Sequence, residues 1–367
     1  MNIDQYRAAF RACTLNISRH KPESIKTTLQ RLADATSDDE QIDNYGSGEL
    51  IEAFEREVAA LLGKEAAVFM PSGTMAQPMA LRIWADLARS DYVALHATSH
   101  LALHEHNSYQ VLWQLKGCEL GEPHRVPLLA DLQSAARNPL AAILLELPMR
   151  EIGGQLPEWE ELVKQSQWAR EQGIKLHMDG ARLWQCPAAY DKSLAEIAAL
   201  FDSVYVSFYK DLGGIAGAML LGSSDFIERT KVWKRRVGGN LYSLFPYIIA
   251  AREGLAQHLD TLPQRRLQAR WLAEQLNRLP GFNTWPAVPQ TNMFRLRIRC
   301  QPEAFLTEGE QWMQQHKVAL IPPPYRSDED AIHCEINIGD AFDALSEDEW
   351  ADWIKTFGQE MAGVLKA

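Results

Sequence analysis

The chain has 367 residues, of which 46% are hydrophobic and 23% are charged, and its formal net charge at pH 7 is −11. This length predicts a large domain and a smaller one, and the ordinary balance of residue types argues against long disorder. The acidic charge excludes a general nucleic-acid or anionic-membrane footprint, and no apolar run reaches transmembrane length. The 5 cysteines are scattered without CxxC pairs and residues 1–10 lack a signal peptide's apolar core, so we expect a reducing, cytoplasmic setting.

Strands and helices alternate along the first two thirds of the chain. Apolar residues at helical spacing predict a helix over 49–62, then a short apolar strand over 66–70 and a second helix over 74–88. Such alternation is typical of an α/β layered fold with a mostly parallel sheet. The alternation returns as a helix over 157–172 and strands over 141–145, 174–178, 204–208 and 218–221.

The last third of the chain predicts a small α+β domain. A long helical stretch over about 247–279, interrupted by Pro263, would bridge the two domains. We therefore predict a large domain with an N-terminal segment over 1–245 and a small C-terminal domain over 246–367. The elements predicted after the long helix are strands over 292–299, 318–321 and 332–338 and helices over 302–316 and 346–364.

One predicted strand ends in a carboxylate. Asp179 follows an apolar run and precedes a glycine turn and Arg182. In open α/β sheets ligands bind at the carboxyl ends of strands, where a carboxylate can hold a cationic ring nitrogen by a charge-assisted hydrogen bond. A carboxylate that only caps the following helix would give the same pattern.

The next predicted strand leads to Lys210, which two glycines follow at 213 and 214. A solvated lysine at a strand end is the ordinary interpretation. The functional alternative is a Schiff-base lysine, whose amine attacks a carbonyl once burial or a nearby cation destabilises the ammonium. The glycines let the backbone approach a bulky cofactor, and Ser207 is a candidate phosphate ligand.

Two further segments complete an ordered set. Ser72-Gly73-Thr74 stands at a predicted helix N-terminus, where free N–H groups and the helix dipole bind anions, although a plain N-cap looks the same. His100 belongs to a residue type that can stack on a cofactor ring and take part in proton transfer. It belongs to a local crowd with His104, Glu105 and His106, but no further ligand cluster supports a metal, and we expect none.

This ordered set resembles the threonine aldolase and β-eliminating lyase family. The resemblance implies an enzyme that uses pyridoxal 5′-phosphate (PLP) and has the aspartate-aminotransferase-like fold. That fold has a three-layer α/β large domain with a mostly parallel sheet and a small α+β C-terminal domain. The resemblance covers roughly 44–240 and is carried by the strings at 44–46, 63–67, 71–74, 176–182 and 210–214, of which Asp-Gly-Ala-Arg at 179–182 is the most specific.

The resemblance also implies a role for each matching residue. Lys210 would carry PLP as a Schiff base, Asp179 would pair with the pyridine nitrogen, and His100 would stack on the ring. Arg182 would lie near the ring hydroxyl and the substrate carboxylate. The residues expected to serve the phosphate are Ser72, Gly73, Thr74 and Ser207.

The implied reaction cleaves L-threonine, L-allo-threonine or a related β-hydroxy-α-amino acid to glycine and an aldehyde. His100, or a water that it positions, would take the proton of the β-hydroxyl, and Glu105 would orient it. Family members assemble as homodimers or homotetramers with sites at subunit interfaces. The residues expected near the substrate are Arg182, His333, Glu105 and, from a neighbouring subunit, Tyr45.

The chain departs from the family's strings mainly on the substrate side. The N-terminal Arg-Ser-Asp-Thr string is absent, and 15–18 stands nearby. The string Glu-Asn-Thr-His-Asn is replaced by Glu-Leu-Pro-Met-Arg at 146–150, which removes a histidine. Tyr209 replaces a serine before the lysine. His333 replaces the carboxylate-binding arginine of the small domain, and Arg326 is near enough in sequence to compensate.

These departures keep a second reaction open. Met149 and His333 are compatible with β-elimination, racemisation or transamination on the same cofactor. Arg150 is either a loop arginine or a contact for a second substrate carboxylate. A non-catalytic relative is a third possibility. The presence of Lys210, Asp179 and His100 together argues against it.

Overall fold

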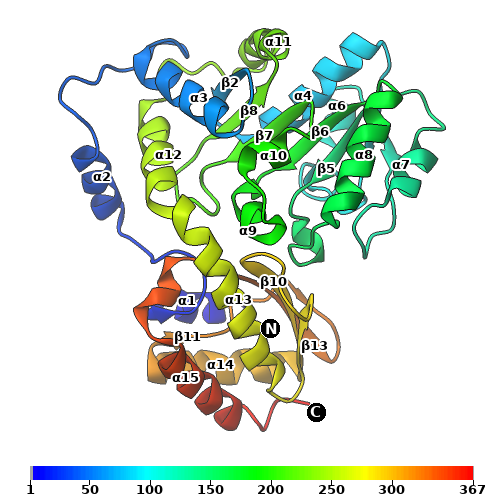
Figure 1. Cartoon of the computed structure of the whole chain (residues 1–367). Coiled ribbons are helices and arrows are strands. Elements are labelled where there is room, and N and C mark those ends of the chain that lie inside the picture. The colour runs from blue at the N-terminus through cyan, green and yellow to red at the C-terminus, as the bar shows by residue number, and fades with distance from the viewer. Residues whose placement is uncertain (1–2, 367) are drawn as a thin grey trace. The chain divides into compact units, whose positions relative to one another are not determined.

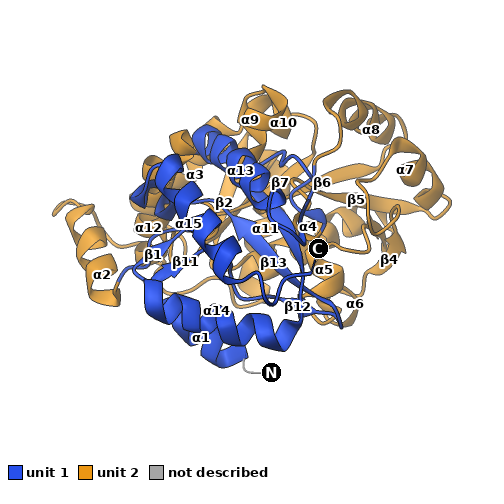
Figure 2. Ribbon diagram, turned by 90° about the horizontal axis from the view of Figure 1, so that it is seen from below, with its two compact units in different colours: residues 1–23, 152–155, 262–367 blue, residues 24–151, 156–261 orange. Residues whose placement is uncertain are grey.

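The computed structural model describes residues 3–366, which fall into two compact units (Figure 2). Unit 2 comprises 24–151 and 156–261, and unit 1 comprises the described residues up to Glu23, together with 152–155 and 262–366. This division differs from the predicted boundary at 245, and it assigns the N-terminal segment to the C-terminal unit.

Long-range pairing explains where the N-terminal segment belongs. Strand β1 (Leu15–Asn16) pairs in parallel with β11 (Val318–Ala319) in unit 1. Helix α1 (Ile3–Ala12) buries Tyr6, whose hydroxyl donates a hydrogen bond of 2.8 Å to the carbonyl of Ile321. Both contacts join residues that are about 300 positions apart, so no local pattern could indicate them.

Unit 2 is built around a seven-stranded sheet (Figure 1). Its interior strands are nearly continuous apolar runs, as expected for a sheet that helices cover on both faces. Strand β8 is antiparallel to both of its neighbours, and the other neighbouring strands are parallel, which confirms a mostly parallel sheet. The strands in spatial order are β2 (Ala66–Met70), β8 (Ala218–Gly222), β7 (Ser203–Ser207), β6 (Lys175–Gly180), β5 (Leu140–Glu146), β3 (Tyr92–Leu95) and β4 (Lys116–Glu119).

Helix α4 (Gly73–Ala88) is the main buried helix of unit 2. Its apolar residues pack on several strands of the sheet, and Trp84 stacks on Phe226 with ring centroids 4.7 Å apart. This helix confirms the prediction over 74–88. The other helices are α2 (Ile25–Asp34), α3 (Glu49–Leu61), α5 (His100–Leu103), α6 (Ser108–Val111), α7 (Leu129–Ala135), α8 (Trp159–Glu171), α9 (Cys186–Tyr190), α10 (Leu194–Ala198), α11 (Ser224–Arg236) and α12 (Phe245–His258).

Unit 1 contains a four-stranded antiparallel sheet and three long helices. The strand order is β12 (Arg326–Ser327), β13 (Ala331–Asn337), β10 (Met293–Arg299) and β9 (Phe282–Trp285). Alternate residues of β10 and β13 are apolar and form the core with the helices. These helices are α13 (Leu262–Asn277), α14 (Pro302–His316) and α15 (Glu347–Glu360). The small α+β architecture is therefore as predicted.

The long helix predicted over 247–279 is two helices. Helix α12 ends at His258, a short 3-10 turn spans Leu259–Thr261, and α13 begins at Leu262. Pro263 lies in the first turn of α13, where its missing N–H costs no hydrogen bond. Within residues 3–366, no helix has the length and apolar character needed to cross a membrane.

Candidate active site

The carboxyl ends of three neighbouring strands bring polar residues together in unit 2. Strands β5, β6 and β7 are parallel, so their ends meet at one edge of the sheet. Asp179 in β6 lies directly beside Glu146, the last residue of β5. Lys210 follows shortly after β7, and its charge interacts with both carboxyls. The structure thus adds Glu146 to the predicted site residues Asp179 and Lys210. The only indication of Glu146 in the sequence is that it is a polar residue at the end of a buried strand.

The two carboxyls perturb each other. Burial, followed by the negative charge of Asp179, raises the pKa of Glu146 to about 8. Burial also raises the pKa of Asp179, against the opposing effect of Lys210. Backbone N–H groups hold both side chains: Ala181 donates to Asp179 at 3.1 Å and Arg150 donates to Glu146 at 3.0 Å. Two adjacent carboxylates resist double ionisation, so the pair retains a proton at neutral pH unless another cation enters the site.

Lys210 has the opposite perturbation. Burial, followed by the charge of Arg182, lowers the pKa of its ammonium to about 8, and the neighbouring carboxyls only partly oppose this. An amine with this pKa is partly neutral at physiological pH and can act as a nucleophile. Lys210 therefore has the property that a covalent cofactor attachment requires.

The first turn of α4, also in unit 2, offers an anion site. Ser72 occupies the N-cap position of this 16-residue helix without a capping hydrogen bond from its side chain to any described residue. The first N–H groups of the helix are thus left for a ligand. Gly73 is required here, because a Cβ at this position would lie 1.9 Å from the hydroxyl oxygen of Tyr205. Thr74 is exposed beside it.

The hydroxyl of Ser207, which was expected to donate to a phosphate, donates to a backbone carbonyl in the structure. The residue is fully buried at the end of β7, and its hydroxyl donates a hydrogen bond of 2.8 Å to the carbonyl of Ala181. Its own carbonyl accepts a hydrogen bond of 2.8 Å from the indole of Trp184. Its proton is therefore directed to the turn that follows Asp179, and its contribution to a phosphate stays a prediction.

His100 is oriented by a buried carboxylate. Its Nδ1 lies 3.0 Å from Oε1 of Glu105, and the other oxygen of Glu105 accepts a hydrogen bond of 2.9 Å from the Ser108 hydroxyl. The Glu105 side chain is 1% exposed, whereas the His100 side chain is 40% exposed. Both oxygens of Glu105 are thus engaged by protein groups, so the geometry suits it to positioning His100 and not to contacting substrate.

A second buried histidine ties α4 to the strands that carry the site. His177 in β6 lies 2.8 Å from the Ser203 hydroxyl through Nδ1 and 2.7 Å from Oε1 of Gln77 through Nε2. Ser203 also accepts a hydrogen bond of 2.8 Å from the Trp84 indole. The hydroxyl of Ser203 therefore donates to Nδ1, and Nε2 carries the imidazole proton toward Gln77. Burial lowers the pKa of His177 to about 3, so the ring is neutral.

Tyr45 is exposed in unit 2 and contacts a second tyrosine. Tyr45 is 55% exposed, and its ring lies edge-on to that of Tyr242, with the ring centroids 5.4 Å apart. Its N–H donates a hydrogen bond of 2.8 Å to the carbonyl of Tyr242. A contribution of Tyr45 to a neighbour's substrate site stays a prediction.

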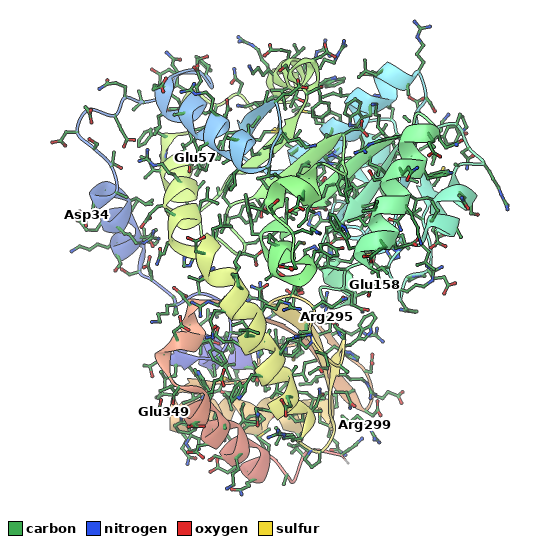
Figure 3. All side chains as sticks on the ribbon, in the orientation of Figure 1. Asp34, Glu57, Glu158, Arg295, Arg299 and Glu349 are labelled. Atoms are coloured by element: carbon green, nitrogen blue, oxygen red, sulfur yellow. The ribbon has the colours of Figure 1, made fainter. Side chains whose placement is uncertain are left out.

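Two other residues considered for the substrate lie in unit 1 and share one carboxylate. His333 and Arg326 both bind Asp328, each with a nitrogen–oxygen distance of 2.7 Å. Arg295, in the adjacent strand β10, is labelled in Figure 3. Its guanidinium carbon lies 4.2 Å from the ring centroid of Tyr325. The substrate-binding role of His333 stays a prediction.

Comparison with solved structures shows two close matches over nearly the whole chain. One is a candidate L-allo-threonine aldolase from Listeria monocytogenes EGD-E, with 39% identity, a TM-score of 0.93, and coverage of 98% of this chain and 99% of that chain. The other is a candidate aromatic amino acid β-eliminating lyase/threonine aldolase from Exiguobacterium sp. 255-15, with 40% identity, a TM-score of 0.93, and coverage of 97% and 99%.

Sequence relatives agree with the structural matches. The low specificity L-threonine aldolase of Escherichia coli is 30% identical over 287 residues, which span 77% of this chain and 84% of the relative. The β-eliminating lyase family model matches residues 24–299, a stretch that includes all the unit 2 residues described above. The chain therefore belongs to the β-eliminating lyase family.

Proposed function

We propose that this protein is a PLP-dependent aldehyde-lyase that cleaves L-threonine, L-allo-threonine or a related β-hydroxy-α-amino acid to glycine and an aldehyde. The observation that supports this most is that unit 2 combines a nucleophilic lysine, a buried aspartate and an oriented histidine. The same chain is 39% identical, over 98% of its length, to the candidate L-allo-threonine aldolase.

The residues present fit PLP. Burial penalises the charge of Asp179, and a cationic ring nitrogen beside it would offset that penalty. Lys210 would hold the cofactor covalently, the first turn of α4 would bind its phosphate, and His100 would cover its ring. When bound, PLP supplies an electron sink for the electron pair that the broken Cα–Cβ bond leaves.

His100 and Glu105 would manage the proton of the β-hydroxyl. A carboxylate only accepts hydrogen bonds, so Nδ1 of His100 carries the proton toward Glu105 and Nε2 keeps a lone pair. Nε2 can then take the hydroxyl proton while the Cα–Cβ bond breaks and the aldehyde leaves. Glu105 stabilises the resulting imidazolium, and Arg182 would hold the substrate carboxylate. A proton returned to Cα completes glycine.

Elimination, racemisation or transamination is the second candidate function. The observation that favours it is Met149, which is 2% exposed and stands where the family's string has a histidine. A buried thioether takes no part in proton transfer, so one acid–base group of the substrate side is missing at this position. Pyruvate, ammonia or a keto acid among the products would identify such a reaction.

We also propose a homodimer or homotetramer in a cytoplasmic setting. Support for assembly comes from exposed apolar residues around Tyr45 and Tyr242 in unit 2. Support for a reducing compartment comes from the scattered cysteine positions. The partner in catalysis would be a small amino acid.

The test is aldehyde release from L-threonine and L-allo-threonine, assayed separately with added PLP and an NADH-coupled alcohol dehydrogenase. We expect acetaldehyde from the native protein and none from Lys210→Ala. If neither isomer releases aldehyde but the cofactor spectrum still responds to amino acids, the second candidate function is favoured. A protein that binds no PLP would contradict both.

A further inference from the structure

A second imidazole stands beside His100. His104, at the C-terminal cap of α5, has its ring centroid 5.2 Å from that of His100. Its Nε2 lies 3.0 Å from Oε1 of Glu151, and the same oxygen accepts a hydrogen bond of 2.8 Å from Nη1 of Arg150. His104 is thus held by a carboxylate that an arginine in turn holds.

The carboxylate comes from the strand end that carries the site. Glu151 lies in the short 3-10 turn at Arg150–Ile152, shortly after β5, and the Arg150 N–H binds the terminal carboxylate of that strand, Glu146. His104 is therefore positioned from two sides, by α5 through the backbone and by the β5 edge through Glu151. Both anchors belong to unit 2.

This arrangement sets the protonation of the ring. Glu151 accepts a hydrogen bond, so the Nε2 of neutral His104 carries the proton and Nδ1 keeps a lone pair. The side chain is 41% exposed, so the lone pair remains accessible to a ligand. An exposed side-chain contact of this kind contributes little to folding stability, so stability alone does not explain why it is present.

The position of His104 suits the hydroxyl end of the substrate. If His100 covers the cofactor ring, the ring of His104, whose centroid is 5.2 Å from that of His100, would be available to the side chain of a bound amino acid. L-threonine and L-allo-threonine differ only in the direction of the β-hydroxyl. Two imidazoles, each with its own carboxylate, offer that hydroxyl an acceptor in two directions.

We propose that His104 is a hydroxyl-binding residue that determines which β-epimer the enzyme cleaves, with Glu151 as its positioning residue. This inference rests on the proposed aldehyde-lyase function. It also accounts for Met149: an imidazole is supplied from α5 where the family's string supplies one from the loop after β5. Arg150 donates from Nη1 to Glu151 and so helps to hold the carboxylate that positions His104.

The experiment compares kcat/KM for L-threonine and L-allo-threonine in the holoenzyme and in His104→Phe. We expect the ratio of the two values to change roughly tenfold or more, because one epimer loses its acceptor. The spectral response of bound PLP to glycine, which has no hydroxyl, should stay within about twofold. Glu151→Gln should move the ratio in the same direction, and Glu151→Asp should restore part of it.

A matched control is His316→Phe in α14, since His316 makes a similar 3.0 Å pair with Glu360. It should leave the ratio unchanged. An unchanged ratio in His104→Phe, or an equal loss for both epimers and for glycine binding, would overturn the inference while the aldehyde-lyase function stands. A native holoenzyme that cleaves neither epimer would instead refute the proposed function, and this inference with it.

Discussion

The charge of Lys210 is disfavoured by its surroundings in the folded chain. Its ordinary pKa is 10.5, and burial followed by Arg182 lowers it to about 8. Below pH 8 both the folded and the unfolded chain carry the ammonium, so the folded state bears the full cost of burying it. Between about 8 and 10.5 the folded chain releases the proton first, and the cost disappears as the pH rises.

The cofactor-free protein should therefore gain stability when this charge is removed. Lys210→Met should raise the free energy of unfolding by about 3 kcal/mol at pH 7, and this gain should shrink as the pH rises from 8 toward 10. Urea unfolding at several pH values measures both quantities. Lys164→Met, at an exposed position of α8, is the control and should show no such trend. A gain that is the same at pH 7 and pH 9.5 would show that Lys210 is not charged against its surroundings.

Helix α4 joins two tasks at the scale of the element. Its first turn is left for an anion, and its next turn is fixed to β6 and β7 through Gln77, His177 and Ser203. The neutral imidazole of His177 resists protonation in the folded state but not in the unfolded chain. Unfolding therefore takes up a proton below about pH 6.5, and stability falls as the pH drops toward 3.

Replacing this histidine should flatten the acid side of the stability profile. In the native protein, His177 accounts for a loss of about 2 kcal/mol between pH 7 and pH 5. His177→Gln should lose that much less over this range, although it should be less stable at pH 7 by about 1 to 3 kcal/mol because the buried network is broken. Chemical unfolding at both pH values gives the comparison. His124→Gln, at an exposed position, should retain the native slope.

The sequence predicted these elements well, but it did not predict which residues they contact in space. Asp179 and Lys210 could be identified because each ends or follows a buried run, where a polar side chain is conspicuous. Glu146 ends a run in the same way, yet its pairing with Asp179 depends on strand order, which local periodicity does not contain. The support of His104 by Glu151 joins residues of α5 and the turn after β5, so it too required the fold.

At the scale of the whole molecule, the exposed apolar residues of unit 2 predict self-association. Tyr45, Leu241, Tyr242 and Phe245 are each more than a third exposed, and Tyr45 and Tyr242 contact each other. We expect a sedimentation mass of at least twice the 41.5 kDa of one chain. Tyr242→Lys should shift this mass toward the monomer, because a charge would be buried in the contact.

The control for this prediction is Val111→Lys in α6, which also replaces an exposed apolar residue of unit 2. It should leave the mass unchanged. A native protein that sediments as a monomer at micromolar concentration would contradict the assignment of this surface.

The pairing of β1 with β11 also has a consequence for how the chain is made. Proteins are synthesised from the N-terminus, so Leu15 leaves the ribosome long before Val318, its partner, has been added. By then the residues of unit 2, which end at Thr261, are complete and able to fold. This early segment is therefore among the last to reach its place.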